Sequence, residues 1–414
     1  MRDLLQRAGE RYRVEGVGGL FEKSLSFGRR AGRIDTLYPN LFLEHSIGVV
    51  SRSELRNNWK SWSFSEEAEI HIEIPTENPI TGQSPPSRLL ENAGKYKRDK
   101  PFVAELTNVD LIGRKAIPIV EDGIVLESFS SRRDRLENYL LENKGELARL
   151  RRYRSQSNAD TQYDCVCSFA SVGSGYCGWV QSTLTRLQGL EHYEQVTGNQ
   201  PKILLPQNPA EWMIDSLKFF GYSEDDLIVW DGEVATAERF VVPSVRTGEY
   251  TGSYYRAKLS HDDPLRVVHP GACEWLRKES YQKLDIEPQS TEKFLYISRA
   301  EASRRSVRNR DDLERVLENY GFEIRRMESL PFSKQIEEIA KADLILSPHG
   351  AGLVNTIFAS DATVIELFGS NVKSTYFLLS SLLENEYQFV KSDQAGNDII
   401  INPNTISKIL ESSG

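Results

Sequence analysis

The stretch LILSPHGAGLVNTIFASDATVIELFG, residues 344–369, contains residues that could bind a phosphorylated ligand. His349, Gly350 and Gly352 follow a short apolar run and precede small residues, which predicts a strand, a tight turn and a helix. The first amides of a helix have no partner within it, and glycines with positive φ let a ligand approach the backbone. His349 could donate to a phosphate oxygen, and Glu366, ending the next strand, could accept two ribose hydroxyls. The pattern indicates a nucleotide diphosphate.

A second polar cluster follows another predicted strand, in YISRAEASRRSVRN. Arg299 ends this strand, and the loop beyond it carries Arg304, Arg305, Arg308 and Asn309. Guanidinium groups suit a pyrophosphate because each can donate two parallel N–H bonds to it. Each cluster also has an ordinary interpretation, namely a helix cap or core histidine and an ion-paired surface loop. The nucleotide hypothesis depends on both clusters lying at one edge of a sheet.

Alternating strands and helices should bring the two clusters together. Apolar runs of strand length alternate with helical patterns, which predicts parallel strands with crossover helices. The strands expected in this unit are 293–299, 322–329, 343–347, 363–369 and 386–392. An earlier unit of the same kind has expected strands at 163–171, 202–206, 227–230 and 239–244. Ligands bind at the carboxyl ends of parallel strands, so two such units would face each other across a cleft.

The chain divides into four regions on these patterns. They are a basic amphipathic segment over 1–33, an N-terminal domain over 34–268, a C-terminal ligand-binding domain over 269–395 and a closing helix over 396–414. The N-terminal domain includes a β meander at 102–129 and a charged helix over 132–152, which we expect to be a solvated connector.

Composition and charge exclude several classes of protein. The net charge of −9 argues against a nucleic-acid partner, and four cysteines are too few for a disulfide framework. No apolar run reaches the length of a membrane span, which predicts a cytoplasmic protein. The segment 1–33 carries eight Lys and Arg against four acids. It could contact the inner face of a membrane, or it could pack on the chain itself or on a sister subunit in a homo-oligomer.

The motifs resemble glycosyltransferase family 61. The similar segments are YISR with the arginines after it, Gln335 in FSKQI, PHGAGLVNTIF and VIELFG, and the upstream GYCGWVQSTLTRLQGL resembles the family's N-Y-x-H-W-L-x-D-x-L-P-R-L helix. The resemblance covers about residues 101–395. It implies a GT-B type of α/β fold, with two Rossmann-like domains facing a cleft, here after a small β-containing N-terminal region. It also implies inverting transfer without a metal or other cofactor, and the chain has no Asp-x-Asp.

The resemblance also implies roles for particular residues. Arg299 and His349 would be catalytic, because they would neutralise the diphosphate as it leaves. The implied donor-binding residues are Arg304, Arg305, Asn309, Gly350, Ala351, Gly352, Asn355 and Glu366. On the acceptor side only Trp179, Leu184, Arg186 and Leu187 follow the family pattern, and we take Trp179 and Arg186 as the candidate contacts.

The acceptor-side helix departs from the family at three positions. Gly178, Ser182 and Thr185 stand where the family has histidine, aspartate and proline. Inverting transfer needs a base to take the proton of the acceptor hydroxyl, and this chain leaves that base unassigned. We favour an active glycosyltransferase that moves a hexosyl or pentosyl group from a nucleotide sugar, with UDP expected, to a glycan or lipid-linked acceptor of surface polysaccharide or glycoprotein assembly. The alternative is a non-catalytic scaffold that binds a nucleotide sugar or a glycan. An NAD-dependent Rossmann enzyme is a weaker third hypothesis.

Overall fold

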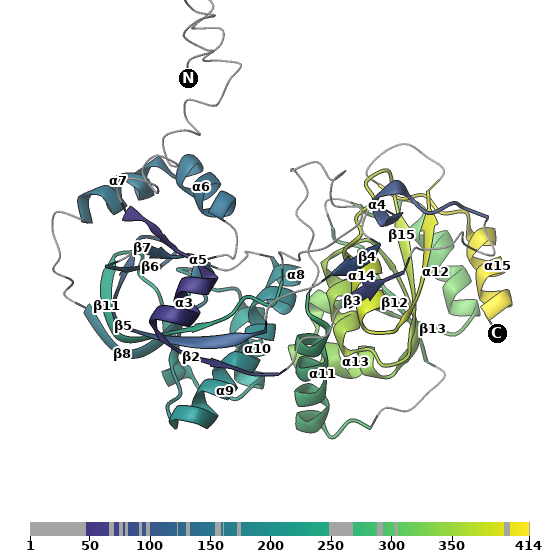
Figure 1. Ribbon diagram of the computed structural model, residues 1–414. Helices are drawn as coiled ribbons and strands as arrows, with labels where there is room; N and C mark the ends of the chain where they lie inside the picture. Colours follow the sequence, from purple (N-terminus) through teal and green to yellow (C-terminus); the bar gives the residue numbers. More distant parts are fainter. Residues whose placement is uncertain are drawn as a thin grey trace, which may run out of the picture.

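The computed structural model describes residues 47–413 except 66–69, 74–77, 79–81, 91–92, 97–99, 122, 130–132, 154–158, 160, 172–174, 248–267, 288–292, 303–304 and 393–397. The basic segment predicted over 1–33 and the candidate Arg304 lie outside the described residues. The described part contains two large sheets, a two-stranded hairpin and surrounding helices, which confirms an α/β fold (Figure 1). No helix in this part of the chain has the length and apolar character needed to cross a membrane.

The first sheet has nine strands in the order β1-β7-β6-β5-β11-β8-β9-β10, with β2 paired to β5. Their bounds are β1 (Val49–Val50), β2 (Lys60–Ser63), β5 (Phe102–Ile112), β6 (Ile117–Val120), β7 (Gly123–Val125), β8 (Thr161–Ser168), β9 (Lys202–Leu205), β10 (Leu227–Val229) and β11 (Val234–Pro243). The predicted meander and the first α/β unit are one sheet, because β11 pairs antiparallel with β5 and parallel with β8. This sheet is therefore mixed and lacks the all-parallel order of a Rossmann-like domain.

Helices of several kinds accompany the first sheet. They are α3 (Arg52–Asn58), α5 (Leu126–Phe129), α6 (Arg133–Glu142), α7 (Lys144–Tyr153), α8 (Tyr176–Gly178), the π-helix η2 (Trp179–Thr183), the 3-10 helix η3 (Leu184–Arg186), α9 (Leu187–Thr197), α10 (Glu211–Phe219) and the 3-10 helix η4 (Glu224–Asp226). The helix predicted over 132–152 is two helices, α6 and α7, and it is not a solvated connector. Leu136, Leu140, Leu147 and Leu150 are buried in one cluster with isoleucines of the first sheet. These four leucines form a buried face on two helices whose other residues are mostly charged.

The second sheet has five strands in the order β13-β12-β14-β15-β16, and every neighbouring pair is parallel. The strands are β12 (Lys293–Ile297), β13 (Phe322–Arg325), β14 (Ala342–Pro348), β15 (Thr363–Phe368) and β16 (Glu386–Lys391). Its helices are α11 (Pro270–Leu284), α12 (Arg310–Asn319), η6 (Met327–Ser329), α13 (Phe332–Ala340), η7 (Ala351–Phe358), α14 (Thr375–Leu382) and α15 (Pro403–Ser413), of which η6 and η7 are 3-10. All five predicted strands are confirmed, and their carboxyl ends share one edge.

A segment from the first half of the chain packs on the second sheet. The hairpin β3 (Ile70–Ile72) and β4 (Gly94–Tyr96) lies beside α14, and the short helix α4 (Ser87–Leu90) lies above it in Figure 1. The side chain of Gln83 pairs with the backbone of Lys391, accepting from its N–H at 2.8 Å and donating to its carbonyl at 3.2 Å. This segment covers the exposed edge of β16, so a part of the predicted domain 34–268 belongs in space to the second sheet.

Aromatic side chains join the two sheets into one continuous core. The ring of Phe332, at the start of α13, lies 5.5 Å from that of Phe219 and 5.7 Å from that of Phe358. The backbone N–H of Phe332 also donates to Asp215 of α10 at 2.7 Å. These contacts fix the position of the first half of the chain relative to the edge of the second sheet.

Candidate active site

His349 follows β14 directly, at the edge where the parallel strands of the second sheet end. Its backbone N–H donates to the carbonyl of Leu367 at 2.9 Å, so β15 holds the turn in place. The imidazole packs against the rings of Phe368 and Tyr376, with centroids 5.6 and 5.3 Å away. Its Nδ1 is hydrogen-bonded to Glu366. The imidazole, only 6% exposed, is therefore held in one orientation.

Glu366 is buried beneath His349. Its side chain is 0% exposed, one carboxylate oxygen bonds to His349, and the other accepts from the hydroxyl of Tyr387 at 2.6 Å. Burial raises the pKa of Tyr387 well above its usual value, and the neighbouring carboxylate raises it further, so the phenol keeps its proton. The prediction that Glu366 accepts two ribose hydroxyls does not agree with this geometry, because both oxygens are engaged inside the protein.

Gly350 lies against the guanidinium group of Arg299. A Cβ at Gly350 would lie 1.9 Å from Nη1 and 2.5 Å from Cζ of that arginine. Neither Gly350 nor Gly352 has a positive φ, so the expected left-handed turn is wrong. The φ of Gly350 is −175°, which any residue can adopt. Glycine is required here by the close approach of Arg299, and the next residue, Ala351, opens η7.

A second arginine lies near Arg299. Burial lowers the pKa of Arg299, and the positive charge of Arg305 lowers it further. Arg305 has a φ of 58°, a left-handed conformation that costs a non-glycine residue about 1 kcal/mol or more. Two guanidinium groups that repel each other beside the amides of a helix start create a local field that favours an anion.

A pocket of about 540 Å³ extends from Arg299 toward the start of α12. It is lined by Tyr296, Ser298, Arg299, Ala300, Ser306, Val307, Arg308, Asn309, Arg310, Asp311, Asp312 and Arg315. Its volume lies within the usual range for small-ligand sites. Two of these residues hold the pocket wall: Arg308 pairs with Asp398, and Asn309 donates to the carbonyl of Ile401 at 2.7 Å and accepts from its N–H at 3.3 Å. Asn309 therefore anchors the last segment of the chain through its amide while it also lines the pocket, and its predicted role in donor binding stays a prediction.

Asn355 also has a structural place. It is 0% exposed, accepts from the hydroxyl of Tyr176 at 2.8 Å and donates to Gln335 at 2.8 Å. Gln335 in turn donates to the carbonyl of Leu330 at 3.0 Å. This network ties α8 to η7 and α13, so Asn355 joins the two halves of the protein and does not reach a donor.

The two acceptor-side candidates are both in the interior. Trp179 is 0% exposed and its indole N–H donates to Ser216 at 2.9 Å. Arg186 is 2% exposed, donates to the carbonyl of Pro243 at 2.8 and 3.0 Å, and lies over the ring of Phe169. Neither side chain can contact an acceptor, so the prediction of acceptor contacts at these positions is wrong.

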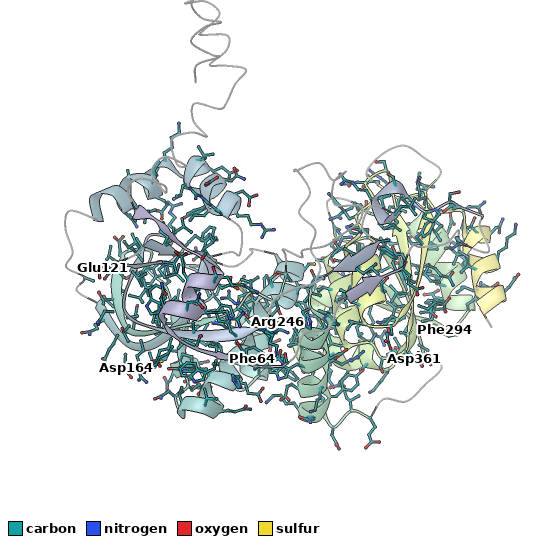
Figure 2. The ribbon with its side chains drawn as sticks, in the orientation of Figure 1. Phe64, Glu121, Asp164, Arg246, Phe294 and Asp361 are labelled. Carbon is teal, nitrogen blue, oxygen red and sulfur yellow. The ribbon has the colours of Figure 1, made fainter. Side chains whose placement is uncertain are left out.

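Other residues of the first half lie closer to the second sheet. Ser182, where the family has aspartate, hydrogen-bonds to the hydroxyl of Thr247 at 3.0 Å. Arg246, next to Thr247 in the chain, is buried over the ring of Phe64, and Figure 2 labels both Arg246 and Phe64 on the side of the first half that faces the second sheet.

Among the described residues, no three His, Cys, Asp or Glu side chains gather as a metal site requires.

Three site residues, Tyr376, Tyr387 and Cys177, have no signature in the sequence. Tyr376 contacts the ring of His349, and burial, the thiol of Cys177 and the charge of Glu366 raise its pKa well above the usual value. Tyr387 supports Glu366 from β16. The three residues come from α14, β16 and α8, so no spacing along the chain could have grouped them.

A glycine spacing after β8 bears on the dinucleotide hypothesis. Gly173, Gly175 and Gly178 have the G-x-G-x-x-G spacing of that class. In dinucleotide-binding enzymes a regular helix follows these glycines, and an Asp or Glu after the second strand binds the ribose. Here the helix is interrupted by the π-helix η2, and Pro206 and Gln207 follow β9 in place of the acid. The spacing alone is weak support for an NAD enzyme.

The comparison with known proteins supports the glycosyltransferase hypothesis. The model of the Glycosyltransferase 61 family matches residues 176–365. This segment belongs to glycosyltransferase family 61. The match begins at α8 and ends one residue before Glu366, so it includes Arg299 and the turn at His349 and Gly350, and it supports glycosyltransferase activity. No curated protein gives a significant match to the chain.

Proposed function

We propose that this member of family 61 is an inverting, metal-independent glycosyltransferase that uses a nucleotide-sugar donor, with UDP as the expected nucleotide. The observation that carries the proposal is Arg299 against the turn at Gly350, with the charge of Arg305 close enough to lower the pKa of Arg299. Arg299 lies so close to Gly350 that no side chain fits between them. A diphosphate bound there would meet guanidinium groups on one side and the first amides of η7 on the other.

The same groups would assist the chemical step. Negative charge grows on the diphosphate as its bond to the sugar breaks, and preorganised positive groups stabilise that charge most where water is excluded. Arg299 is half-buried and His349 is almost wholly buried, so both would act with little screening. In this proposal they do the electrostatic work that a divalent metal does in other transferases.

The pocket beside Arg299 would hold the nucleoside. It opens from the arginine that contacts Gly350 and has a volume of about 540 Å³. We propose that the two sheets form the two halves of a GT-B protein, with the β3–β4 hairpin packed on the second half, and that the acceptor enters between them. The acceptor would be a glycan or a lipid-linked glycan, and either a hexosyl or a pentosyl group could be transferred.

A scaffold that binds without catalysis is the second candidate. It is favoured by the acceptor-side helix, where Trp179 and Arg186 are buried and Ser182 is engaged with Thr247. Residues 178–187, where the family has its histidine and aspartate, contain no carboxylate or imidazole that could serve as a base. A protein of this kind would bind the nucleotide sugar and transfer nothing.

The two candidates are separated by calorimetric titration with UDP, GDP and CMP, followed by hydrolysis assays with the matching nucleotide sugar. We expect UDP binding in the wild type and a loss of about 10-fold or more in Arg299→Ala, because a charge-assisted hydrogen bond contributes about 1.5–3 kcal/mol. Arg239→Ala is the matched control, since Arg239 pairs with Asp164 on the first sheet. Binding without hydrolysis or transfer would support the scaffold, and no binding of any of the three nucleotides would overturn both candidates.

A further inference from the structure

His349 and Glu366 form a buried pair whose geometry selects one form of the imidazole. An ionised carboxylate only accepts hydrogen bonds, so the Nδ1 of His349 that faces Glu366 must carry a proton. In a neutral imidazole the other nitrogen, Nε2, is then a bare acceptor. Within the described part of the chain, Nε2 makes no hydrogen bond.

The second oxygen of Glu366 is also engaged inside the protein. It accepts from the hydroxyl of Tyr387 at 2.6 Å, and the phenol retains its proton because burial and the carboxylate itself raise its pKa. The two donors approach from different strands, β14 and β16, and leave the carboxylate no room to rotate. This arrangement resembles the way in which enzymes orient a histidine through a buried acid.

The groups around His349 come from every element packed against it. Glu366 is the one carboxylate in contact with the ring among the described residues. Tyr376 of α14 also contacts the ring, and burial raises the pKa of its phenol, which Cys177 of α8 approaches. Arg299 lies over the adjacent Gly350, and Arg305 is near enough to affect Tyr376. A bound diphosphate would bring negative charge close to the imidazole, which favours a proton on Nε2.

We propose that Glu366 is a positioning residue that holds His349 as the Nδ1–H tautomer, and that binding of a nucleotide diphosphate makes Nε2 take up a proton from the solvent. The second statement rests on the proposed function, whereas the first does not. The imidazolium then donates from Nε2 to a phosphate oxygen, and the proton returns to the solvent when the nucleotide leaves. The N–H bond forms as a hydronium ion or a buffer acid gives up its proton, and the reverse occurs on release.

The tautomer is tested without any ligand by ¹⁵N NMR of the histidine rings. The chain has six histidines, and His349→Gln identifies the signal of interest by its loss. We expect the wild-type protein to show a protonated Nδ1 and an unprotonated Nε2 at pH 8. Tyr387→Phe keeps the carboxylate and should keep this tautomer, which makes it the control for disturbing the same buried cluster. A wild-type His349 with its proton on Nε2 would overturn the proposal.

Proton uptake is tested by titrating UDP into the full chain in buffers with low and high ionisation enthalpy, such as PIPES and Tris at pH 7.5. We expect uptake of roughly half a proton or more per UDP bound, none in His349→Gln, and at least a threefold smaller value in Glu366→Gln. The glutamine preserves the shape of the side chain without its charge. Unchanged uptake in Glu366→Gln would overturn the proposal. Failure of the wild type to bind UDP would overturn the proposed nucleotide, and the NMR result would still decide the role of Glu366.

Discussion

Replacing Gly350 with alanine should weaken donor binding without weakening the fold. The new Cβ would lie 1.9 Å from Nη1, 2.5 Å from Cζ and 2.8 Å from Cδ of Arg299. Since van der Waals contact lies near about 3.5 Å, the guanidinium group must move by about 1 Å or more. The backbone of Gly350 is extended, so alanine adds no strain and lowers the entropy of the unfolded chain.

The magnitude follows from what Arg299 is proposed to do. Loss of a charge-assisted hydrogen bond to a phosphate costs about 1.5–3 kcal/mol, which corresponds to about a 10- to 150-fold weaker affinity for UDP. We expect the melting temperature to stay the same or rise slightly. Calorimetry measures the affinity, and Gly145→Ala is the control, because a Cβ at Gly145 meets nothing within 4 Å.

A double-mutant cycle shows whether the effect passes through Arg299. If alanine at 350 acts only by displacing this arginine, Gly350→Ala should have no further effect on UDP affinity once Arg299→Ala is present. Two losses that add in the double variant would refute the reasoning, and so would a Gly350→Ala protein that binds UDP as tightly as the wild type.

Three further predictions concern residues in the interior. Arg186→Met should lower the free energy of unfolding by about 2–4 kcal/mol, measured by urea denaturation, because it leaves buried carbonyls without a donor; an equal stability would contradict this. Tyr176→Phe should cost about 1 kcal/mol or more in the same assay, because the hydroxyl donates to both Asn355 and Gln335. Burial raises the pKa of Cys167 and Cys273 to about 12, so both thiols stay protonated below that pH. Iodoacetamide at pH 8 should therefore alkylate only half-buried Cys177 among the described cysteines. Mass spectrometry of the native protein measures this, and alkylation of any other cysteine would contradict the prediction.

The second sheet could be predicted from the sequence because its strands are buried on both faces. Such strands appear as short continuous apolar runs, and Ile345 and Val364, for example, are 0% exposed. The first sheet was harder to predict. Strand β11 was expected as a short parallel strand, whereas it extends to Val234 and pairs with β5 on its other side. Pairing between strands more than 100 residues apart has no signature in local pattern.

The polar residues of the candidate site were also predictable in part. The sequence correctly placed Arg299 and His349 at one edge, because carboxyl ends of neighbouring parallel strands must meet there. It could not show that the amides of Asn309 and Asn355 also have partners inside the protein, because the sequence beside a motif does not reveal what a polar side chain contacts. Asn309 binds the backbone of Ile401, and Asn355 binds Tyr176, 179 residues away in the chain.

The sequence by itself determined the α/β class, the five strands of the second sheet and the family, because these depend on residue types and on spacing along the chain. Only the tertiary structure decided which polar side chains are available to a ligand. Glu366 illustrates the reason: its position at the end of β15 was predictable, but its burial between His349 and Tyr387 depends on β14 and β16 lying on either side of it. Whether a carboxylate faces a ribose or supports an imidazole is set by the groups that pack around it.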